Sequence, residues 1–283
     1  MVAKTTSIEK AGYPTSKISS RYQIGADKIQ YTLNNFAPIG LNEMDKVTLL
    51  NRTDTKFVMT IEQLAQALRS VSDQYRVLVI EHQRIQHYRT LYFDTPKFDF
   101  YHRQTSGYHD IFKVRTREYM DTRVSFLEVK YKDQKKRTDK KRLCTQAPVT
   151  ALDENVDEFL GDYNPYTSKD LEPKLWNTFT RITLVSKYNL ERLTIDFDLG
   201  FFNDERAFYL DGIVIAEVKQ DGFSTHSDFI QLMRQMGLRS SGFSKYCFGA
   251  SLLFEQLKHN VIKPKLLMVN KLNQGAIRYA RVF

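Results

Sequence analysis

The chain has 283 residues, with 42 Lys and Arg against 33 Asp and Glu, so its formal net charge is +9. A hydrophobic fraction of 42% is enough for a substantial core and argues against intrinsic disorder. No apolar run approaches the ~20 residues that span a bilayer, and the N-terminus lacks the apolar core of a secretory signal. Cys144 and Cys247 lie far apart without metal-ligand spacing, which predicts free thiols and a reducing, cytoplasmic compartment.

The first elements follow a polar tail. We expect this tail over residues 1–27, and a single domain over residues 28–258. Residues 47–59 predict a strand, and Thr60 predicts the N-cap of a helix over residues 61–71, with Gln63 at the capping-box position. Residues 76–94 predict two strands on either side of a turn near residues 81–84. A short linking segment then carries Arg103.

Residues 111–142 predict two strands and the start of a third. Because side chains alternate along a strand, each strand has one charged face, with Lys113, Arg115 and Arg117 on the first strand and Glu128, Lys130 and Lys132 on the second. A dense basic run follows over residues 135–142. A solvated sheet face with a basic loop is the simpler interpretation. However, cations about 7 Å apart on one strand repel by about 2 kcal/mol at a dielectric of ~20, which favours a bound polyanion.

The second half of the chain predicts more strands than helices. Residues 151–160 and 169–176 predict short helices, and strand patterns follow at residues 177–188, 191–200, 207–211 and 212–219. Residues 223–237 predict a helix, and Ser244 predicts the N-cap of another. The basic tail over residues 259–283 has no clear pattern. Without βαβ alternation, we expect an α+β fold with an antiparallel β-barrel or sheet and flanking helices.

The charged faces of the predicted strands are mainly cationic, while the opposite faces are apolar or small. Besides the two strands above, the charged faces hold Arg52, Asp54 and Lys56; Arg181; Arg192, Asp196 and Asp198; and Glu217 and Lys219. Burying the apolar faces under helices would turn the charged faces into a barrel interior that accepts a linear anion. Among its carboxylates, chiefly Glu217 would suit a hard divalent cation. Asp196 and Asp198 fit ion pairs or a metal shell equally well.

Eight short motifs occur in an order that resembles a known family. They are Arg-Thr-Asp-Thr-Lys-Phe (52–57), Tyr-Phe-Asp-Thr (92–95), Lys-Val-Arg-Thr-Arg (113–117), Phe-Leu-Glu-Val-Lys (126–130), Thr-Arg (180–181), Glu-Arg-Leu-Thr-Ile-Asp (191–196), Glu-Val-Lys (217–219) and Ser-Lys-Tyr (244–246). This series resembles the VTC-type polyphosphate polymerase domain, the catalytic domain of the vacuolar transporter chaperone complex. That family is a branch of the triphosphate tunnel metalloenzymes, which are CYTH-like proteins. The resemblance covers roughly residues 28–258.

The resemblance implies a triphosphate tunnel and assigns its lining. Residues expected to hold the triphosphate of ATP and the polyphosphate product are Lys56, Arg115, Arg117, Lys130, Arg181 and Arg192. Further substrate-binding candidates are Arg52, Arg103, Lys113, Lys132, Lys219, Lys245 at the tunnel wall, and Lys141 or a neighbour in the basic run. Glu217 would hold a catalytic Mn²⁺ or Mg²⁺.

Two positions depart from related patterns. The family usually has Tyr two residues before the arginine that corresponds to Arg181, where this chain has Phe179. Hydrolytic and cyclising relatives carry Glu-x-Glu-x-Lys in the first strand, where this chain has Arg52-x-Asp54-x-Lys56. The loss of one carboxylate disfavours two-metal hydrolysis. The sequence also holds no SPX-like helical module.

Three functions remain open on the sequence. The first is a metal-dependent polyphosphate polymerase that transfers the γ-phosphoryl group of ATP to a growing chain. The second is a metal-dependent tunnel hydrolase of triphosphate or nucleoside triphosphates, and the third is a non-catalytic polyanion-binding module. The expected partners are ATP, polyphosphate, triphosphate and pyrophosphate, with no nucleic acid and no known membrane partner. A P-loop is excluded because no Gly-x4-Gly-Lys-Ser/Thr occurs.

Overall fold

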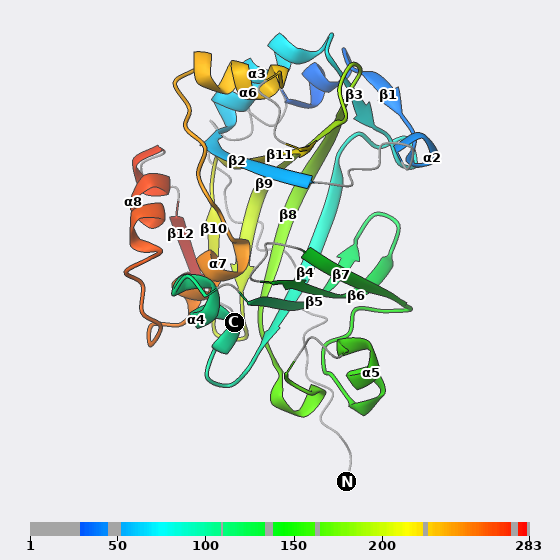
Figure 1. Cartoon of the computed structure of the whole chain (residues 1–283). Helices are drawn as coiled ribbons and strands as arrows, with labels where there is room; N and C mark the ends of the chain where they lie inside the picture. Colours follow the sequence, from blue (N-terminus) through cyan, green and yellow to red (C-terminus); the bar gives the residue numbers. More distant parts are fainter. Residues whose placement is uncertain are drawn as a thin grey trace.

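The computed structural model describes residues 29–44, 52–108, 110–133, 138–161, 165–222, 226–272 and 277–281. Within these ranges one twelve-stranded sheet forms the body of the molecule (Figure 1). The strands are β1 (Ala37–Ile39), β2 (Arg52–Thr60), β3 (Tyr75–Leu78), β4 (Gln86–Asp94), β5 (Ile111–Tyr119), β6 (Val124–Lys132), β7 (Thr138–Thr145), β8 (Glu172–Ser186), β9 (Glu191–Phe202), β10 (Arg206–Leu210), β11 (Ile213–Asp221) and β12 (Ile277–Arg281).

Short helices flank this sheet. They are α2 (Leu41–Met44), α3 (Ile61–Val71), α4 (Asp99–Thr105), α5 (Asp157–Leu160), α6 (Asp228–Gln235), α7 (Lys245–Leu253) and α8 (Lys263–Leu272), with 3-10 turns η2 (Glu154–Val156) and η3 (Ser168–Asp170). Among the described residues, no helix combines the length and the apolar character needed to cross a bilayer.

Eight strands form an open antiparallel barrel. The hydrogen-bonded order is β2, β11, β9, β8, β4, β5, β6 and β7. The predicted α+β class with an antiparallel barrel and flanking helices is confirmed. In the described ranges the barrel is not closed by pairing between β2 and β7, so β7 is an edge strand. At the β2 edge, the Ser241 amide donates a hydrogen bond to the Lys56 carbonyl at 2.8 Å.

Strand β9 pairs with two different strands along the same edge, because its backbone changes direction at Asp198. Its first half pairs with β11 and its second half with β10, which carries β12 at the outer edge. Asp198 adopts a positive φ of 54°, and the pairing of β8 with β9 shifts register between Thr178 and Thr180. This irregularity lets one long strand belong to the barrel wall and to its extension.

Local sequence signals explain several boundaries. Thr60 caps α3, since its hydroxyl accepts from the Gln63 amide at 3.3 Å and the Gln63 side chain accepts from the Thr60 amide at 2.9 Å. Ser244 likewise caps α7 through the Cys247 amide at 3.4 Å. Both caps were predicted from the sequence.

The apolar faces predicted for the strands form the core. Side chains of β2, β9 and β11, including Phe57, Ile195 and Val218, pack beneath α3 and α6. A second cluster gathers β4, β5 and β8 with α4, α7 and α8. Helices α3 and α6 therefore cover the outer, apolar face of β2, β9 and β11, whereas α7 lies against the inner face of the sheet, where Tyr246 packs on Tyr92.

Four segments differ from expectation. Residues 169–176 form a 3-10 turn and the start of β8, because Leu175 and Trp176 pair with β4 and this pairing overrides local helix preference. The segment around Arg103 is the helix α4, and the stretch after Val261 holds α8 and β12. The acidic helix expected over 151–160 is limited to η2 and α5.

Candidate functional site: a cation-lined barrel interior

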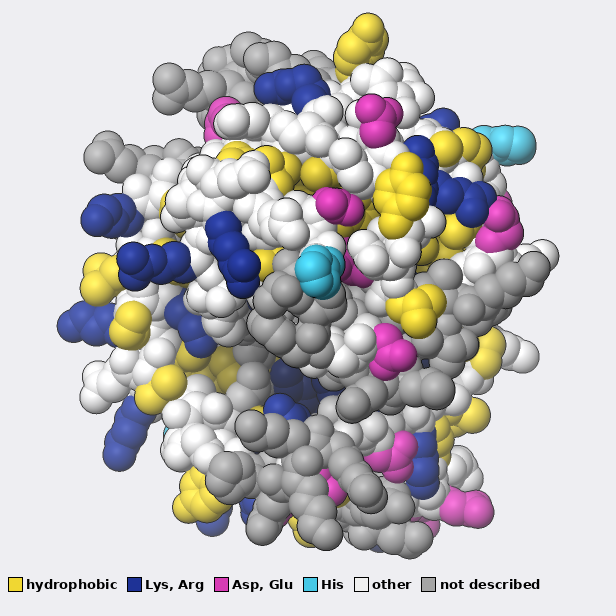
Figure 2. Space-filling model, turned by 45° about the horizontal axis from the view of Figure 1, so that its top comes forward, with side chains coloured by type: hydrophobic (Ala, Val, Ile, Leu, Met, Phe, Trp, Pro, Cys, Tyr) yellow, Lys and Arg dark blue, Asp and Glu magenta, His cyan; other side chains and the backbone are white. Residues whose placement is uncertain are grey.

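Strand register brings the charged faces together on the inside of the open barrel. Residues that face each other across a ladder project to the same side of the sheet. The aligned sets are Lys113, Lys130 and Lys140; Arg115, Glu128 and Arg142; Arg181 and Asp196; Lys56, Glu217 and Thr194; and Asp54, Lys219 and Arg192. In Figure 2, Lys and Arg side chains lie recessed in a hollow of the face that is shown.

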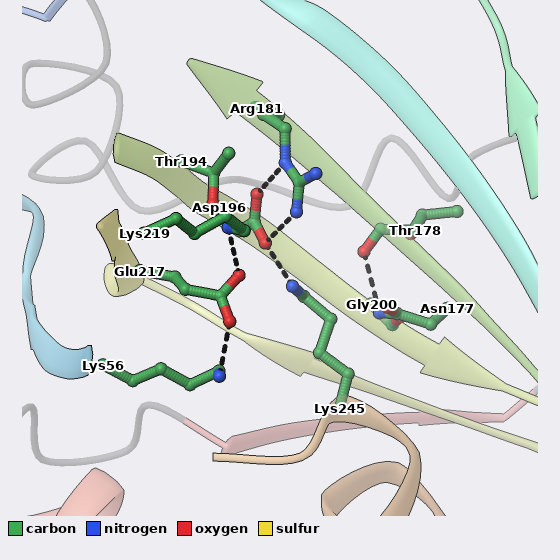
Figure 3. Close-up of polar contacts among 10 residues, drawn as sticks. All are labelled: Lys56, Asn177, Thr178, Arg181, Thr194, Asp196, Gly200, Glu217, Lys219 and Lys245. Carbon is green, nitrogen blue, oxygen red and sulfur yellow. Dashed lines mark hydrogen bonds and ion pairs between the residues drawn. The ribbon is translucent and has the colours of Figure 1, made fainter. Parts of the chain in front are cut away.

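Glu217 on β11 is the first of three carboxylates that gather cations (Figure 3). One carboxylate oxygen pairs with Lys56 of β2 and the other with Lys219, two residues along β11. Lys219 also donates to the Thr194 hydroxyl at 2.9 Å. Burial alone would raise the pKa of Glu217, but Lys219 and Lys56 hold this pKa well below its usual range.

Asp196 on β9 is the second carboxylate. Arg181 of β8 binds it through two nitrogens at 2.5 and 2.8 Å, and Lys245 reaches the same group from the first turn of α7 (Figure 3). The Lys245 ammonium lies 4.3 Å from the Phe179 ring centroid, and the Arg181 guanidinium lies 5.1 Å from it. Asp196 is thus an ion-pair partner of interior cations.

Helix α7 is held in place by a buried acid. Asp94, fully buried at the end of β4, accepts hydrogen bonds from the Phe100 and Tyr101 amides at 2.9 and 3.0 Å and from the Tyr246 hydroxyl. The carboxylate therefore joins β4, the start of α4 and α7. Because Lys245 precedes Tyr246, this link also positions the Lys245 ammonium.

Glu128 on β6 is the third carboxylate and is 1% exposed. Arg115 and Lys140 each contact it at 2.7 Å, Arg142 at 3.0 Å and Arg117 at 3.8 Å. Burial alone would raise the pKa of Glu128, but Arg115, Arg117 and Lys140 hold this pKa well below its usual range.

The three clusters form one site, because their charges act on each other across the interior. Arg117 lies within reach of the charges of Arg115, Glu128 and Arg181. Burial, together with the charges of Arg115 and Lys56, lowers the pKa of Lys113 to about 8. The cations nevertheless remain open to solvent: side chains of Lys56, Arg115 and Lys245 are 27%, 21% and 15% exposed. These interior side chains are therefore accessible to solvent.

The remaining sequence candidates lie at the margins or elsewhere. Lys130 and Lys132 lie on the interior face of β6, and Arg192 on that of β9 donates to the Met44 carbonyl at 3.3 Å. Arg103 lies on α4, with its guanidinium 5.9 Å from the ring of Phe112, which projects from the opposite face of β5. The side chain of Arg52 lies outside the described part of the structure.

The register of β7 decides which of its cations face inward. Lys141 lies opposite Val129, on the outer face, whereas Lys140 and Arg142 lie opposite Lys130 and Glu128. The structure therefore places neighbours of Lys141 inside the barrel and Lys141 outside it. The sequence prediction named Lys141 or a neighbour; alternation puts Lys140 and Arg142 on one face, and the pairing with β6 shows that this face points inward.

Two aromatic residues of β4 also line the interior. Tyr92 lies opposite Arg115, and Tyr88 stacks on Phe179 with ring centroids 5.0 Å apart. Asp198, by contrast, accepts from the Thr180 hydroxyl at 3.0 Å, away from the Arg181 side of β8. The sequence carried no signal for Tyr88, because a tyrosine in a strand is as typical of a core.

The described side chains alone do not make a complete site for a divalent cation. In the described residues no group of three His, Cys, Asp or Glu side chains is placed to hold a metal ion. Glu217 is one carboxylate, and both of its oxygens contact lysines. Mg²⁺ commonly binds through one or two carboxylates with substrate phosphates and water, and Glu217 can supply that one ligand.

The fold and the site define an open antiparallel barrel whose interior is lined mainly by cationic side chains. The sequence matches the VTC domain over residues 51–254, well over half of the chain. The chain therefore belongs to the VTC domain family, a family of tunnel enzymes that act on phosphate compounds. Among curated proteins, none matches this chain.

Solved structures show distant likeness. A conserved hypothetical protein from Pyrococcus furiosus is 10% identical with a TM-score of 0.40, and the match covers 70% of this chain and 99% of that one. A Pyrococcus horikoshii OT3 protein is 14% identical with a TM-score of 0.39, covering 76% and 99%. A Hippeastrum protein described as having a dominant triphosphatase activity is 12% identical with a TM-score of 0.39, covering 74% and 100%. These likenesses are too distant to bear on the substrate of this chain.

Proposed function

We propose that this protein is an ATP–polyphosphate phosphotransferase that extends inorganic polyphosphate inside the cationic barrel. The observation that carries the proposal is the excess of interior charge. Eight Lys and Arg side chains share three carboxylates among the described residues, which leaves five positive charges in these clusters. A linear polyanion compensates this excess and matches the membership in the VTC domain family.

The chemistry asks the protein for positioning and charge neutralisation. A terminal phosphate oxygen of the growing chain attacks the γ-phosphorus of ATP. The bond from that phosphorus to the β–γ bridging oxygen breaks, ADP leaves, and the chain becomes one phosphate longer. Because the attacking oxygen is already ionised, no general base is required, which suits an interior built from arginines and lysines.

Named residues take defined parts in this step. Arg115, Arg117 and Arg181 present planar forks that fit phosphate oxygens in pairs, while Lys56 and Lys245 supply compact charges. Glu217 would hold a Mn²⁺ or Mg²⁺ ion, which would supply positive charge that neutralises the phosphates. The acceptor would be polyphosphate or a shorter primer such as triphosphate or pyrophosphate, in the cytoplasm.

Incubation with ATP and Mn²⁺ or Mg²⁺ tests the proposal. The expected products are ADP and long phosphate chains that resolve as a ladder on a gel. Release of orthophosphate without chains would instead establish a tunnel hydrolase. Binding of tripolyphosphate without any turnover would establish a non-catalytic polyanion-binding module.

The variant Glu217→Gln tests the proposed metal role. We expect loss of turnover with most tripolyphosphate affinity retained, since the surrounding cations stay in place. Glu118→Gln is the matched control, because Glu118 lies on the opposite face of β5 and pairs with Arg89 at 2.8 Å. Normal turnover in Glu217→Gln would contradict the metal role.

A further inference from the structure

Glu128 stands out because it is the most buried of the three interior carboxylates and has the most cations around it. It is 1% exposed, against side-chain exposures of 5% for Asp196 and 19% for Glu217. Its partners come from two strands on either side of β6: Arg115 and Arg117 from β5, and Lys140 and Arg142 from β7. A single carboxylate thus ties three neighbouring strands together.

Strand β7 depends on these ion pairs more than the other strands of the barrel do. Within the described residues it ends the ladder, and residues 138–144 are all exposed. The side chains of Lys140 and Arg142 are 37% and 42% exposed, so both could turn toward bulk water. Like charges repel, and Arg115 and Arg117 would push them outward if no anion lay between them.

Glu128 supplies the negative charge that counters this repulsion. Its Oε1 contacts Lys140 and Arg142, while its Oε2 contacts Arg115, so each oxygen serves one neighbouring strand. The cluster keeps three more positive than negative charges. An arginine has five N–H donors, and one carboxylate uses few of them, so the others remain available for phosphate.

We propose that Glu128 is a positioning residue, a built-in anion that holds Lys140 and Arg142 of the edge strand over the barrel interior beside Arg115 and Arg117. This inference rests on the proposed function and assigns to Glu128 the ordering of one wall of the phosphate site. The carboxylate itself does not contact the reacting atoms.

The negative charge of Glu128 has two opposite effects on the phosphate site: it weakens anion binding, but it orders Lys140 and Arg142. Removing the negative charge makes the wall more positive, which favours anion binding. It also releases Lys140 and Arg142 from their inward positions, which impairs the alignment of the phosphates. For Glu128→Gln we therefore expect binding and turnover to change in different directions. Its affinity for tripolyphosphate should be equal to or higher than that of the wild type, and its KM for ATP equal or lower, while kcat should be at least tenfold lower.

Hydrogen exchange supplies a readout that does not depend on turnover. In Glu128→Gln, amide exchange in peptides covering residues 138–145 should rise at least tenfold, and saturating tripolyphosphate should restore protection by replacing the lost anion. Glu118→Gln, which also removes one paired carboxylate near the same strands, should change neither kcat nor exchange in β7. If Glu128→Gln does not fold, Glu128→Asp, which keeps the charge but withdraws it by one methylene, should give the same changes in smaller measure.

Each outcome decides the proposal. Unchanged exchange in β7 or unchanged kcat in a folded Glu128 variant would overturn it, as would exchange that rises equally over the whole chain. If the wild-type protein extends no polyphosphate, the proposed function fails, while the exchange and affinity measurements still test whether Glu128 orders β7.

Discussion

Burial lowers the pKa of two interior lysines, Lys113 and Lys140. Lys113 of β5 is surrounded by Arg115, by Lys56 of β2, by Glu217 of β11 and by Cys247 of α7. Burial is the largest cause that lowers the pKa of Lys113 to about 8, and the attraction of Glu217 offsets only part of it. Burial likewise lowers the pKa of Lys140 to about 8 although Glu128 raises it. Part of the interior charge therefore titrates near neutral pH.

This titration predicts that anion binding takes up protons. Lys113 is mostly charged at pH 7 and mostly neutral at pH 9, whereas a bound polyanion would keep it charged. We expect its share of the tripolyphosphate affinity to fall roughly tenfold over that range. Calorimetry at pH 8 in buffers of different ionisation enthalpy should detect proton uptake, and Lys113→Met should reduce it. An identical uptake in Lys113→Met would contradict this assignment.

The sign for stability is opposite to the sign for binding. Because the pKa of Lys113 is lower in the folded protein than in the unfolded chain, the unfolded chain binds its proton more tightly. The contribution of Lys113 to the free energy of unfolding therefore rises as the pH increases from about 8 toward the ordinary pKa of 10.5, and this gain is lost as the pH falls back to about 8. As the pH rises above about 8, the ligand-free protein should therefore gain stability while its affinity for tripolyphosphate falls.

At the scale of elements, α7 matters because it carries Lys245 into the interior. The helix packs closely on β9: an added Cβ at Gly249 would clash with the ring of the fully buried Phe201. Phe201 also contacts Phe248, with ring centroids 6.0 Å apart, so the ring has little room to move. A glycine at this place lets the helix approach the strand.

Gly249→Ala should consequently destabilise the protein despite the better helix propensity of alanine. Overpacking costs about 1–3 kcal/mol and the propensity returns about 1 kcal/mol, so we expect a net loss of up to about 2 kcal/mol in unfolding free energy. Denaturant titration measures it. The control is Gly242→Ala, because the nearest atom to its Cβ would be the Lys265 Nζ at 4.0 Å. Equal stability of the two variants would show that α7 is not closely packed.

Elements were predictable from the sequence where periodicity or a cap fixed them. Strand alternation predicted β5 and β6, and Thr60 and Ser244 predicted the starts of α3 and α7. The basic run failed to give a register because Lys140, Lys141 and Arg142 are all cationic, and only pairing with β6 distinguishes their faces. Nor could alternation reveal that Asp196 pairs with Lys245, since the two residues come from distant segments joined by the packing of α7.

At the scale of the whole molecule, the fold holds like charges together at a cost. The two Glu-Val-Lys segments, at residues 128–130 and 217–219, lie on β6 and β11 and both face the interior. Each contributes one carboxylate among several cations. The two segments thus place anions in different parts of the wall, and the remaining positive excess is left for a ligand. Stability and binding are coupled through that excess.

Tripolyphosphate should therefore stabilise the fold far more than salt does. At 100-fold above its Kd, a ligand that binds only the folded state adds about 2.7 kcal/mol, which corresponds to a rise in Tm of roughly 5–10 °C. Sodium chloride at equal ionic strength should give a much smaller shift, because it only screens the interior charges. Arg115→Ala should reduce the tripolyphosphate shift, whereas Arg206→Ala, which removes an exposed partner of Glu255 outside the barrel, should retain it. Equal shifts in both variants would mean that the anion binds the outer surface, and the interior would then not be the phosphate site.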